Sequence, residues 1–354
     1  RNVKHMAFQP CQNLPDSVPL DIVGDVHGEL EALQSLLNHL GYQANGFHPQ
    51  GRYLVFVGDL CDRGQNSPAV LAWFKQAYDA GYAYMVLGNH ELNLLAHDPK
   101  DGSGWFFEER AQKDGVMYAP WNNMPEQGKE ELEHWLAKQP LVLQRDDIRI
   151  VHAAWLPEQI ERIEAADGNL VTQYRNWDNE LNATLANAAW YADYQHEKIA
   201  YDEAIGNPLE LPPPMLATAE YELMRSYFHP FRALTSGVEV MADTPFYASG
   251  RWRFSARFAW WDNYTDSVPV VIGHYWRHWY RKENNPQREN LMPEQNNAWH
   301  GAVHNVFCID YSVGARWRDR KNSVPVADSH FRLAALRWPE NTLMFDNGET
   351  SPTC

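Results

Sequence analysis

Residues 20–28 read LDIVGDVHG, a short apolar run that ends in a carboxylate and an imidazole two positions apart. The run has the length and the branched residues of a buried strand. Flanking glycines let the backbone turn sharply around Asp25 and His27. The stretch therefore predicts a strand whose end presents two side chains that can bind a metal ion.

The same pattern recurs twice further along the chain. Tyr53–Val57 precedes the sequence GDLCDRG, and Ala83–Leu87 precedes the sequence GNHE. Apolar residues at helical spacing predict helices over 29–40 and 68–78, between these strands. Strand and helix therefore alternate, which predicts an α/β layer with reactive side chains just past the carboxyl ends of parallel strands.

A long middle segment, about residues 157–266, breaks this pattern. It is rich in Trp, Tyr, Asn and Ala without any repeat, which predicts a mostly helical insertion packed by aromatic side chains. Its role is either structural cover or a lid that shapes a substrate pocket. No Gly/Ser linker separates it, so we expect a single domain over residues 1–354 whose insertion covers the active site. Further strands are expected at 141–144, 148–151, 268–272, 303–309, 331–338 and 342–345, and a helix at 125–138.

Two single histidines follow later strand-like runs: His152 and His274. Alone, a strand-end histidine is more often a hydrogen-bonded surface residue, and an Asp-Arg pair such as Asp62 and Arg63 is usually an ion pair. Five successive strand ends with side chains of metal-binding type are hard to explain by chance. The five segments together therefore predict one metal site.

The formal net charge of −16 limits the class of partner. Nucleic acid polymers and anionic membranes are bound by clustered Lys and Arg, which the sequence does not display. No apolar run reaches the ~18 residues that span a bilayer. We expect a soluble protein that binds neither, and its oligomeric state is not predicted. A small anionic substrate stays compatible, because bound divalent cations reverse the local field.

Cysteine usage and the N-terminus bear on location. The four scattered cysteines suggest neither a disulfide framework nor a thiolate zinc site, which favours a reducing compartment. The chain starts at Arg1 without a recognisable targeting signal, although a removed segment would leave no trace. We expect a cytoplasmic protein in which Cys61 and Cys308 are small buried residues.

The five segments resemble those of the calcineurin-like metallophosphoesterases, in the branch that holds phosphoprotein phosphatases and symmetrical diadenosine tetraphosphatases. The resemblance covers about residues 19–156 and 267–346. The Asp-Arg-Gly ending of the second segment, Glu91 after Asn89-His90, and the lack of a second histidine after Gly273-His274 favour this branch. It implies an α/β (α+β) fold of two central mixed β-sheets flanked by helices, with two metal ions at the strand ends.

The resemblance also implies the metal ligands. Carboxylate, imidazole and amide donors suit Mn, Fe or Zn better than Ca or Mg, so we expect two divalent transition-metal ions whose identity stays open. The implied ligands are Asp25 and His27 for the first ion, Asp59 as the bridge, and Asn89, His152 and His274 for the second.

Catalytic and substrate-binding roles complete the expected site. His90 is free to protonate the leaving oxygen, with Asp62 orienting its ring. Arg63 would bind the substrate phosphate, and a structural salt bridge between Arg63 and Asp62 is the alternative. His152 is followed by two alanines, where eukaryotic phosphoprotein phosphatases usually have two glycines and a second arginine motif. The second phosphate-binding arginine of that group therefore cannot be carried over. The candidates for this second arginine are Arg251, Arg253 and Arg257. The alternative is that they are ordinary surface arginines without a role in binding.

We therefore expect a dinuclear-metal phosphatase that hydrolyses phosphomonoesters, on a phosphoprotein or a small molecule, by direct attack of a metal-bridging hydroxide. Symmetrical hydrolysis of dinucleoside tetraphosphates is the alternative, with exposed aromatics such as Trp252 or Trp260 stacking on adenine. The phosphomonoester is favoured because the charge of −16 leaves few cations to hold a tetraphosphate. A third hypothesis is a non-catalytic metal-binding regulatory module. The presence of His90, Asp62 and Arg63 argues against it.

Overall fold

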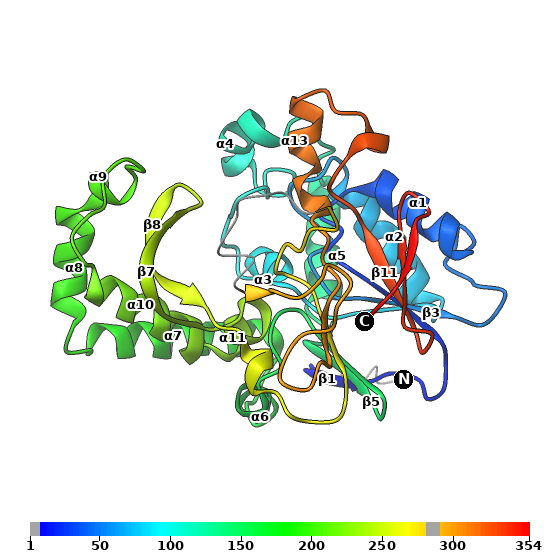
Figure 1. Cartoon of the computed structure of the whole chain (residues 1–354), viewed down its shortest axis with the longest axis horizontal. Helices are drawn as coiled ribbons and strands as arrows, with labels where there is room; N and C mark the ends of the chain where they lie inside the picture. The colour runs from blue at the N-terminus through cyan, green and yellow to red at the C-terminus, as the bar shows by residue number, and fades with distance from the viewer. Residues whose placement is uncertain (1–7, 281–290) are drawn as a thin grey trace.

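The computed structural model describes residues 8–280 and 291–354, which form two central mixed β-sheets flanked by helices (Figure 1). The fold class expected from the sequence is therefore confirmed. Among the described residues, no helix is both long enough and apolar enough to cross a membrane.

One sheet contains the three strands of the first motifs. β2 (Leu20–Val23), β3 (Tyr53–Phe56) and β4 (Ala83–Met85) are adjacent and parallel. The helices α1 (Leu30–Leu40) and α2 (Ser67–Asp79) connect them. The alternation of strand and helix predicted from the sequence is thus confirmed, and it brings the three motifs to one edge of the sheet.

Three strands near the C-terminus extend this sheet. β11 (Ala334–Trp338), β12 (Thr342–Phe345) and β13 (Thr350–Pro352) are antiparallel to their neighbours. The six strands lie in the order β13-β12-β11-β2-β3-β4. The sequence predicted β11 and β12 and missed the short β13.

The second sheet has five strands. It consists of β1 (Cys11–Asn13), β5 (Val142–Arg145), β6 (Ile148–Val151), β9 (Val270–Ile272) and β10 (Val306–Cys308). Their order is β1-β5-β6-β9-β10, and β6 and β9 are parallel neighbours. His152 and His274 therefore emerge from the ends of adjacent strands.

The core between the sheets fixes their relative position. Ile22 and Val55 of one sheet belong to the same buried cluster as Ile150 and Val271 of the other, and all four are fully buried. Side chains alternate along a strand, so the next residues, such as Val23, pack on the opposite face against the helices. The two sheets are thereby held so that their motif-bearing ends form one site.

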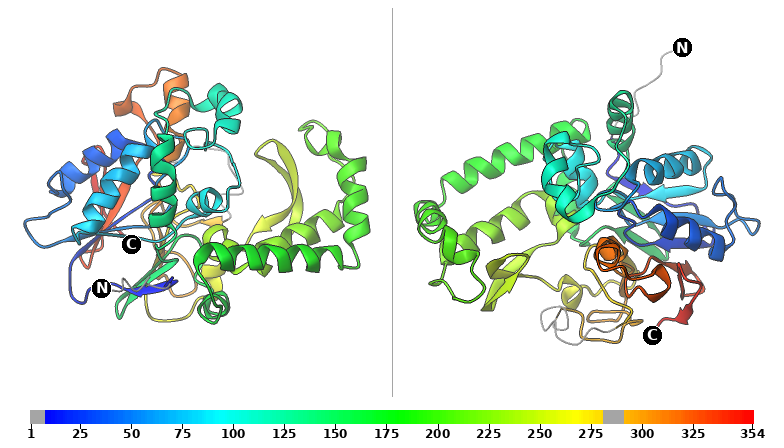
Figure 2. Two further views of the ribbon diagram at one scale, coloured as in Figure 1. Left: turned by 180° about the vertical axis from the view of Figure 1, so that it is seen from behind. Right: turned by 90° about the horizontal axis from the view of Figure 1, so that it is seen from above.

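The insertion projects from one side of the two sheets, as the green and yellow arm in Figures 1 and 2. Six helices make up most of it, as predicted. They are α6 (Pro157–Glu164), α7 (Leu170–Ala186), α8 (Tyr191–Ala200), α9 (Asp202–Ile205), α10 (Leu216–Phe228) and α11 (Pro230–Ser236). The single domain over residues 1–354 stays a prediction.

A β-hairpin in the insertion was not predicted. β7 (Glu239–Ala248) and β8 (Arg251–Arg257) pair antiparallel, within a segment that the sequence predicts to be mostly helical. The alternation of Arg251, Trp252, Arg253 and Phe254 is a period-two pattern of the kind strands show. Average composition hides such a pattern, which explains the error.

The remaining helices surround the strand ends. α5 lies where a helix was predicted over 125–138, whereas α4 was not predicted. These helices are α3 (Asn89–Leu95), α4 (Glu108–Tyr118), α5 (Glu126–Leu136) and α13 (Arg316–Lys321), with 3-10 turns η1 (Trp260–Asn263), η2 (Val313–Ala315) and η3 (Val326–Asp328).

Candidate active site

All six expected ligands lie at the carboxyl ends of strands. Five of them are buried and Asn89, the first residue of α3, is partly exposed. The ligand atoms of Asp59, His152 and His274 all lie within 4.8 Å of one another, as do those of His27, Asp59 and His90. Asp59 belongs to both groups and thus occupies the centre of the site.

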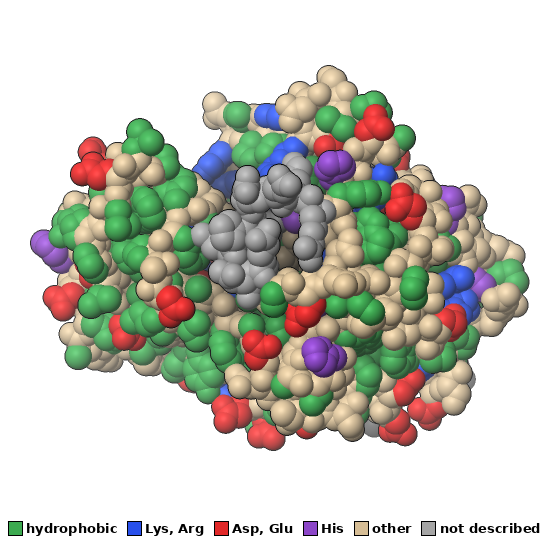
Figure 3. Space-filling view, viewed as in Figure 1, with side chains coloured by type: hydrophobic (Ala, Val, Ile, Leu, Met, Phe, Trp, Pro, Cys, Tyr) green, Lys and Arg blue, Asp and Glu red, His purple; other side chains and the backbone are tan. Residues whose placement is uncertain are grey.

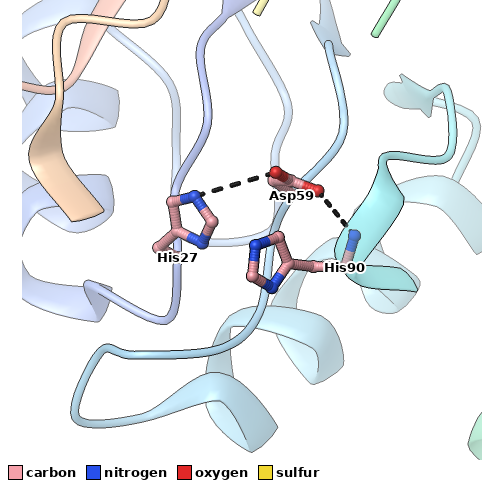
Figure 4. A group of neighbouring side chains, drawn as sticks. All are labelled: His27, Asp59 and His90. Atoms are coloured by element: carbon pink, nitrogen blue, oxygen red, sulfur yellow. Dashed lines mark hydrogen bonds and ion pairs between the residues drawn. The ribbon is translucent and has the colours of Figure 1, made fainter. Parts of the chain in front are cut away.

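His27 presents one ring nitrogen to two carboxylates. Its Nδ1 lies 3.0 Å from the backbone carbonyl of Cys61, so Nδ1 carries the hydrogen. Its Nε2 lies 3.8 Å from Oδ2 of Asp25 and also 3.8 Å from Oδ2 of Asp59. Figure 4 shows His27 pointing toward Asp59, with His90 alongside. Burial lowers the pKa of His27 well below its usual value, which leaves Nε2 as an electron-pair donor.

His152 points its second ring nitrogen at the same carboxylate. Its Nδ1 donates to the backbone carbonyl of Val57 at 2.7 Å. Its Nε2 lies 3.1 Å from Oδ2 of Asp59, and the side chain is fully buried. Two such atoms lie this close only with a proton or a cation between them. Without a metal ion the proton makes this contact, and a bound cation would take its place.

His274 and Asn89 complete the second group. Nδ1 of His274 lies 3.2 Å from Oδ1 of Asn89, and burial lowers the pKa of His274 well below its usual value. The backbone N–H of His274 donates to both oxygens of Asp25, at 3.3 and 3.2 Å. These contacts join the two sheets across the site.

Buried negative charge accumulates here. Burial raises the pKa of Asp25 well above its usual value, and Asp310 raises it further. Burial and the charge of Asp59 raise the pKa of Glu91 to about 7. Burial lowers the pKa of His152, but Asp59 and Asp25 outweigh burial and raise it to about 10. So many carboxylates at close range require nearby positive charge, which divalent cations would supply.

Two carboxylates of this cluster were given no role from the sequence. Asp310 follows β10, is buried, and accepts hydrogen bonds from the backbone N–H groups of Trp276 and Ser312 at 2.9 and 3.0 Å. Glu91 accepts from the backbone N–H groups of Asp59 and Gly88, at 2.6 and 3.1 Å. Their position after a strand was the available signal for both.

The backbone of the site is strained. A positive φ is uncommon for residues other than glycine and costs about 1–3 kcal/mol. Five site residues adopt it: His27 (47°), Asp59 (52°), Asp62 (74°), Arg63 (71°) and His274 (70°). Strain concentrated in this way is typical of functional sites, where the surrounding structure holds side chains in set directions.

The backbone at Gly273 packs closely against the expected ligand Asp25. The substitution Gly273→Ala is therefore expected to weaken metal binding by about 10–100-fold. A Cβ at Gly273 would lie 2.1 Å from Oδ1 of Asp25 and push that carboxylate aside. Metal titration of the purified variant measures the loss. Gly115→Ala in α4 is the control, because its Cβ would meet no atom closer than 3.9 Å. Equal metal affinity of Gly273→Ala and the unmodified chain would contradict the expectation.

His90 and Asp62 form the expected pair. Nδ1 of His90 lies 2.6 Å from Oδ2 of Asp62. The indole N–H of Trp105 donates to the other oxygen of Asp62 at 2.6 Å. Burial lowers the pKa of His90, but Asp59 and Asp62 outweigh burial and raise it above the ordinary value, against an opposing effect of Arg63. Trp105 was not predicted, because no local pattern links it to Asp62.

Removing the indole donor tests whether Trp105 positions this pair. Trp105→Phe is expected to lower kcat for a poor leaving group by about 10-fold or more, as for a lost hydrogen bond to a charged group. The KM and the metal content are expected to change little. Trp121→Phe, whose indole bonds to exposed Asn123, is the control. A loss independent of the leaving group would show that Trp105 serves only to stabilise the fold.

Arg63 does not pair with Asp62, contrary to the structural alternative. Its Nε lies 3.3 Å from Asp101, whose carboxylate also accepts from the hydroxyl of Tyr118 at 2.6 Å. Its guanidinium lies over the ring of Trp276, 5.0 Å from the ring centre. Arg63 is therefore held beside the site with donors still available to a phosphate.

A cavity of about 440 Å³ connects the strand ends with the insertion. Asn89, His90 and His274 line it on the scaffold side. Figure 3 shows Lys and Arg side chains at the rim between the arm and the scaffold. The cationic side chains in its lining are Arg63, Lys100, Arg225, Arg232, Arg251, Arg253 and Arg257. The expectation that the acidic chain offers few cations to a substrate is therefore wrong, because seven cationic side chains line this one cavity.

The aromatic stacking surface expected from the sequence is not formed by the two residues named. Trp260 is only 3% exposed and donates to the backbone carbonyl of Ala153, so its expected exposure is wrong. Trp252 is partly buried, and its indole donates to the carbonyl of Asn207. Neither lines the 440 Å³ cavity. Cys61 and Cys308 are fully buried, as expected.

Comparison with known proteins gives a consistent family. Residues 18–205 match the calcineurin-like phosphoesterases. The asymmetrical bis(5'-nucleosyl)-tetraphosphatase of Oceanobacillus iheyensis is 33% identical over 153 residues, 40% of this chain and 58% of the relative. The symmetrical bis(5'-nucleosyl)-tetraphosphatase of Vibrio parahaemolyticus is 33% identical over 178 residues, 45% of this chain and 60% of the relative. The chain thus spans about three fifths of the length of these two relatives.

One solved structure aligns with the chain at low similarity. The cold-active protein-tyrosine phosphatase of a Shewanella species aligns over 98% of this chain and 82% of its own, with 16% identity and a TM-score of 0.47. At this level the likeness carries no information about the substrate.

Proposed function

The chain belongs to the calcineurin-like phosphoesterases, and from that premise we propose that it is a metal-dependent hydrolase of phosphoric esters. One observation carries the proposal: Nε2 of His152 and the carboxylate of Asp59 lie 3.1 Å apart in a buried group of ligand atoms that also contains His274, beside the pair His90 and Asp62.

The proposed ligands are the six expected from the sequence. Two divalent ions bound there would polarise a water molecule and neutralise the phosphoryl oxygens. The donor set suits Mn, Fe or Zn. The proposed ligands are Asp25, His27, Asp59, Asn89, His152 and His274.

The chain's own residues account for the remaining steps. Arg63 binds the reacting phosphate through its planar donors and is held in place by Asp101 and Trp276. His90 donates a proton to the leaving oxygen, and Asp62 orients the ring through its 2.6 Å contact with Nδ1. The burial of the site excludes bulk water and strengthens these contacts.

Two substrate classes are proposed. A phosphomonoester was expected first, on the ground that cations are scarce. A dinucleoside tetraphosphate is the second candidate. Two observations favour it: seven cationic side chains line the cavity, and the two similar proteins are bis(5'-nucleosyl)-tetraphosphatases. The number of available cations therefore no longer favours the phosphomonoester over the tetraphosphate. The choice between the two substrates depends on measurement.

The deciding experiment compares kcat/KM for an aryl phosphate, a phosphopeptide and diadenosine tetraphosphate on one metal-loaded sample. A preference of about 100-fold for any one of them, roughly 2.7 kcal/mol, assigns the substrate class. If no member of the panel is hydrolysed with Mn, Fe or Zn, a binding module without turnover is the better description.

A further inference from the structure

Three arginines of the insertion line the cavity without a carboxylate partner. Arg225 lies on α10, and Arg253 and Arg257 lie on β8. Within the described part of the chain, no carboxylate oxygen lies within 4.0 Å of the guanidinium of any of them. Other cations of the same lining are paired: Arg251 with Glu222 at 3.0 Å, and Arg232 with Asp178 at 3.0 Å.

The hairpin directs its arginines to one face. Side chains alternate along a strand, so Arg253 and Arg257 share the face opposite Phe254. Phe254 is buried in a small cluster with Met215 and Ala219, which anchors the hairpin to α10. The arginine side of β8 is thereby turned toward the cavity.

The charge of this region is unbalanced. Apart from Asp101, the carboxylates in the cavity lining are Glu222 and Glu239, against seven cationic side chains. Burial and the neighbouring Arg251 lower the pKa of Arg253, although Glu222 and Glu239 oppose this effect. Arg225 and Arg253 are partly buried, and Arg257 is exposed. Arginines that outnumber the carboxylates of one cavity are suited to a multiply charged anion, because planar guanidinium groups bind phosphate oxygens in pairs.

We propose that Arg225, Arg253 and Arg257 form a second anion site, which binds a phosphate group of the substrate other than the one that is hydrolysed. The substrate class is then a compound with at least two phosphate groups, one at Arg63 and His90 and the other at the hairpin. The assignment of the first group rests on the proposed function. The anion site itself does not, because it needs no metal ion.

Direct binding tests the site. Protein freed of metal on a chelating resin is titrated calorimetrically with inorganic tripolyphosphate, a hexose 1,6-bisphosphate and orthophosphate. Arg253→Gln and Arg257→Gln are expected to weaken tripolyphosphate or bisphosphate binding by about 10-fold or more, as for a lost charged hydrogen bond. Arg225→Gln, on a different element, is expected to do the same. Arg175→Gln, an exposed arginine of α7 outside the cavity, is the control.

The two polyanions identify the source of the second phosphate. Loss confined to tripolyphosphate indicates phosphates in one chain, and loss confined to the bisphosphate indicates phosphates on separate positions. Equal affinity of the arginine variants and the unmodified protein for both compounds overturns the proposal. Orthophosphate is expected to bind the unmodified protein more weakly than either polyanion, and equal affinity for all three compounds also overturns the proposal.

An activity measurement separates this proposal from the proposed function. On metal-loaded protein, the arginine variants are expected to lose at least 10-fold more kcat/KM for the hexose bisphosphate or diadenosine tetraphosphate than for p-nitrophenyl phosphate. If the unmodified protein hydrolyses none of them but binds tripolyphosphate through the arginines, the proposed function fails and the anion site stands. Equal losses for all hydrolysed substrates would reject the second site.

Discussion

Asp59→Asn is expected to abolish metal binding and to lower kcat by about 10,000-fold or more, roughly 5.4 kcal/mol of transition-state stabilisation. One oxygen of Asp59 lies 3.1 Å from Nε2 of His152 and 3.8 Å from Nε2 of His27. The other accepts the backbone N–H of His90 at 3.1 Å. Asparagine keeps the shape and one acceptor but removes the charge that both groups of ligand atoms share.

The measurement combines elemental analysis with turnover of an aryl phosphate after metal loading. Circular dichroism checks that the variant stays folded. Asp262→Asn, an exposed residue of η1, is the control for an uninvolved aspartate. A variant that kept both metal equivalents and its activity would remove Asp59 from the centre of the proposed site.

His90→Asn is expected to lower kcat for a poor leaving group by about 100–10,000-fold, the range for a positioned general acid. Aryl phosphates with good leaving groups are expected to lose less, because their leaving oxygen needs little protonation. Metal content is expected to stay constant, since Nδ1 of His90 is engaged by Asp62 at 2.6 Å.

The metal measurement is decisive for His90, because its ring also lies within ligand distance of His27 and Asp59. Loss of one metal equivalent in His90→Asn would make it a ligand instead of an acid. Equal loss of kcat for good and poor leaving groups would exclude proton donation as its role. His134→Asn, on α5 outside the cavity lining, provides a matched histidine control.

The scaffold could be predicted because its signals are local. A buried strand and the polar residues after it lie within one stretch of about ten residues, as in Leu20–Gly28. Parallel strands then bring such ends together by a general rule of sheet architecture. The sequence therefore predicts that His152 and His274, which are far apart along the chain, lie beside Asn89.

The cavity wall could not be predicted in the same way. Arg225 and Arg232 come from two helices of the insertion, and no motif marks them. Their approach to the strand ends depends on how the arm packs, which is a property of tertiary structure. Trp105 is similar, since it reaches Asp62 across 43 positions of sequence without any pattern at either end. Net charge was misleading because it averages over the whole surface.

The division of the proposed ligands between the two sheets has a consequence for folding. Asp25, Asp59 and Asn89 follow strands of the six-stranded sheet, whereas His152 and His274 follow strands of the five-stranded one. Ions shared between them would act as cross-links that oppose separation of the sheets. During synthesis His274 leaves the ribosome 185 residues after Asn89, so the coordination set is completed late. Binding of both metal ions would therefore occur only after the two sheets have packed against each other.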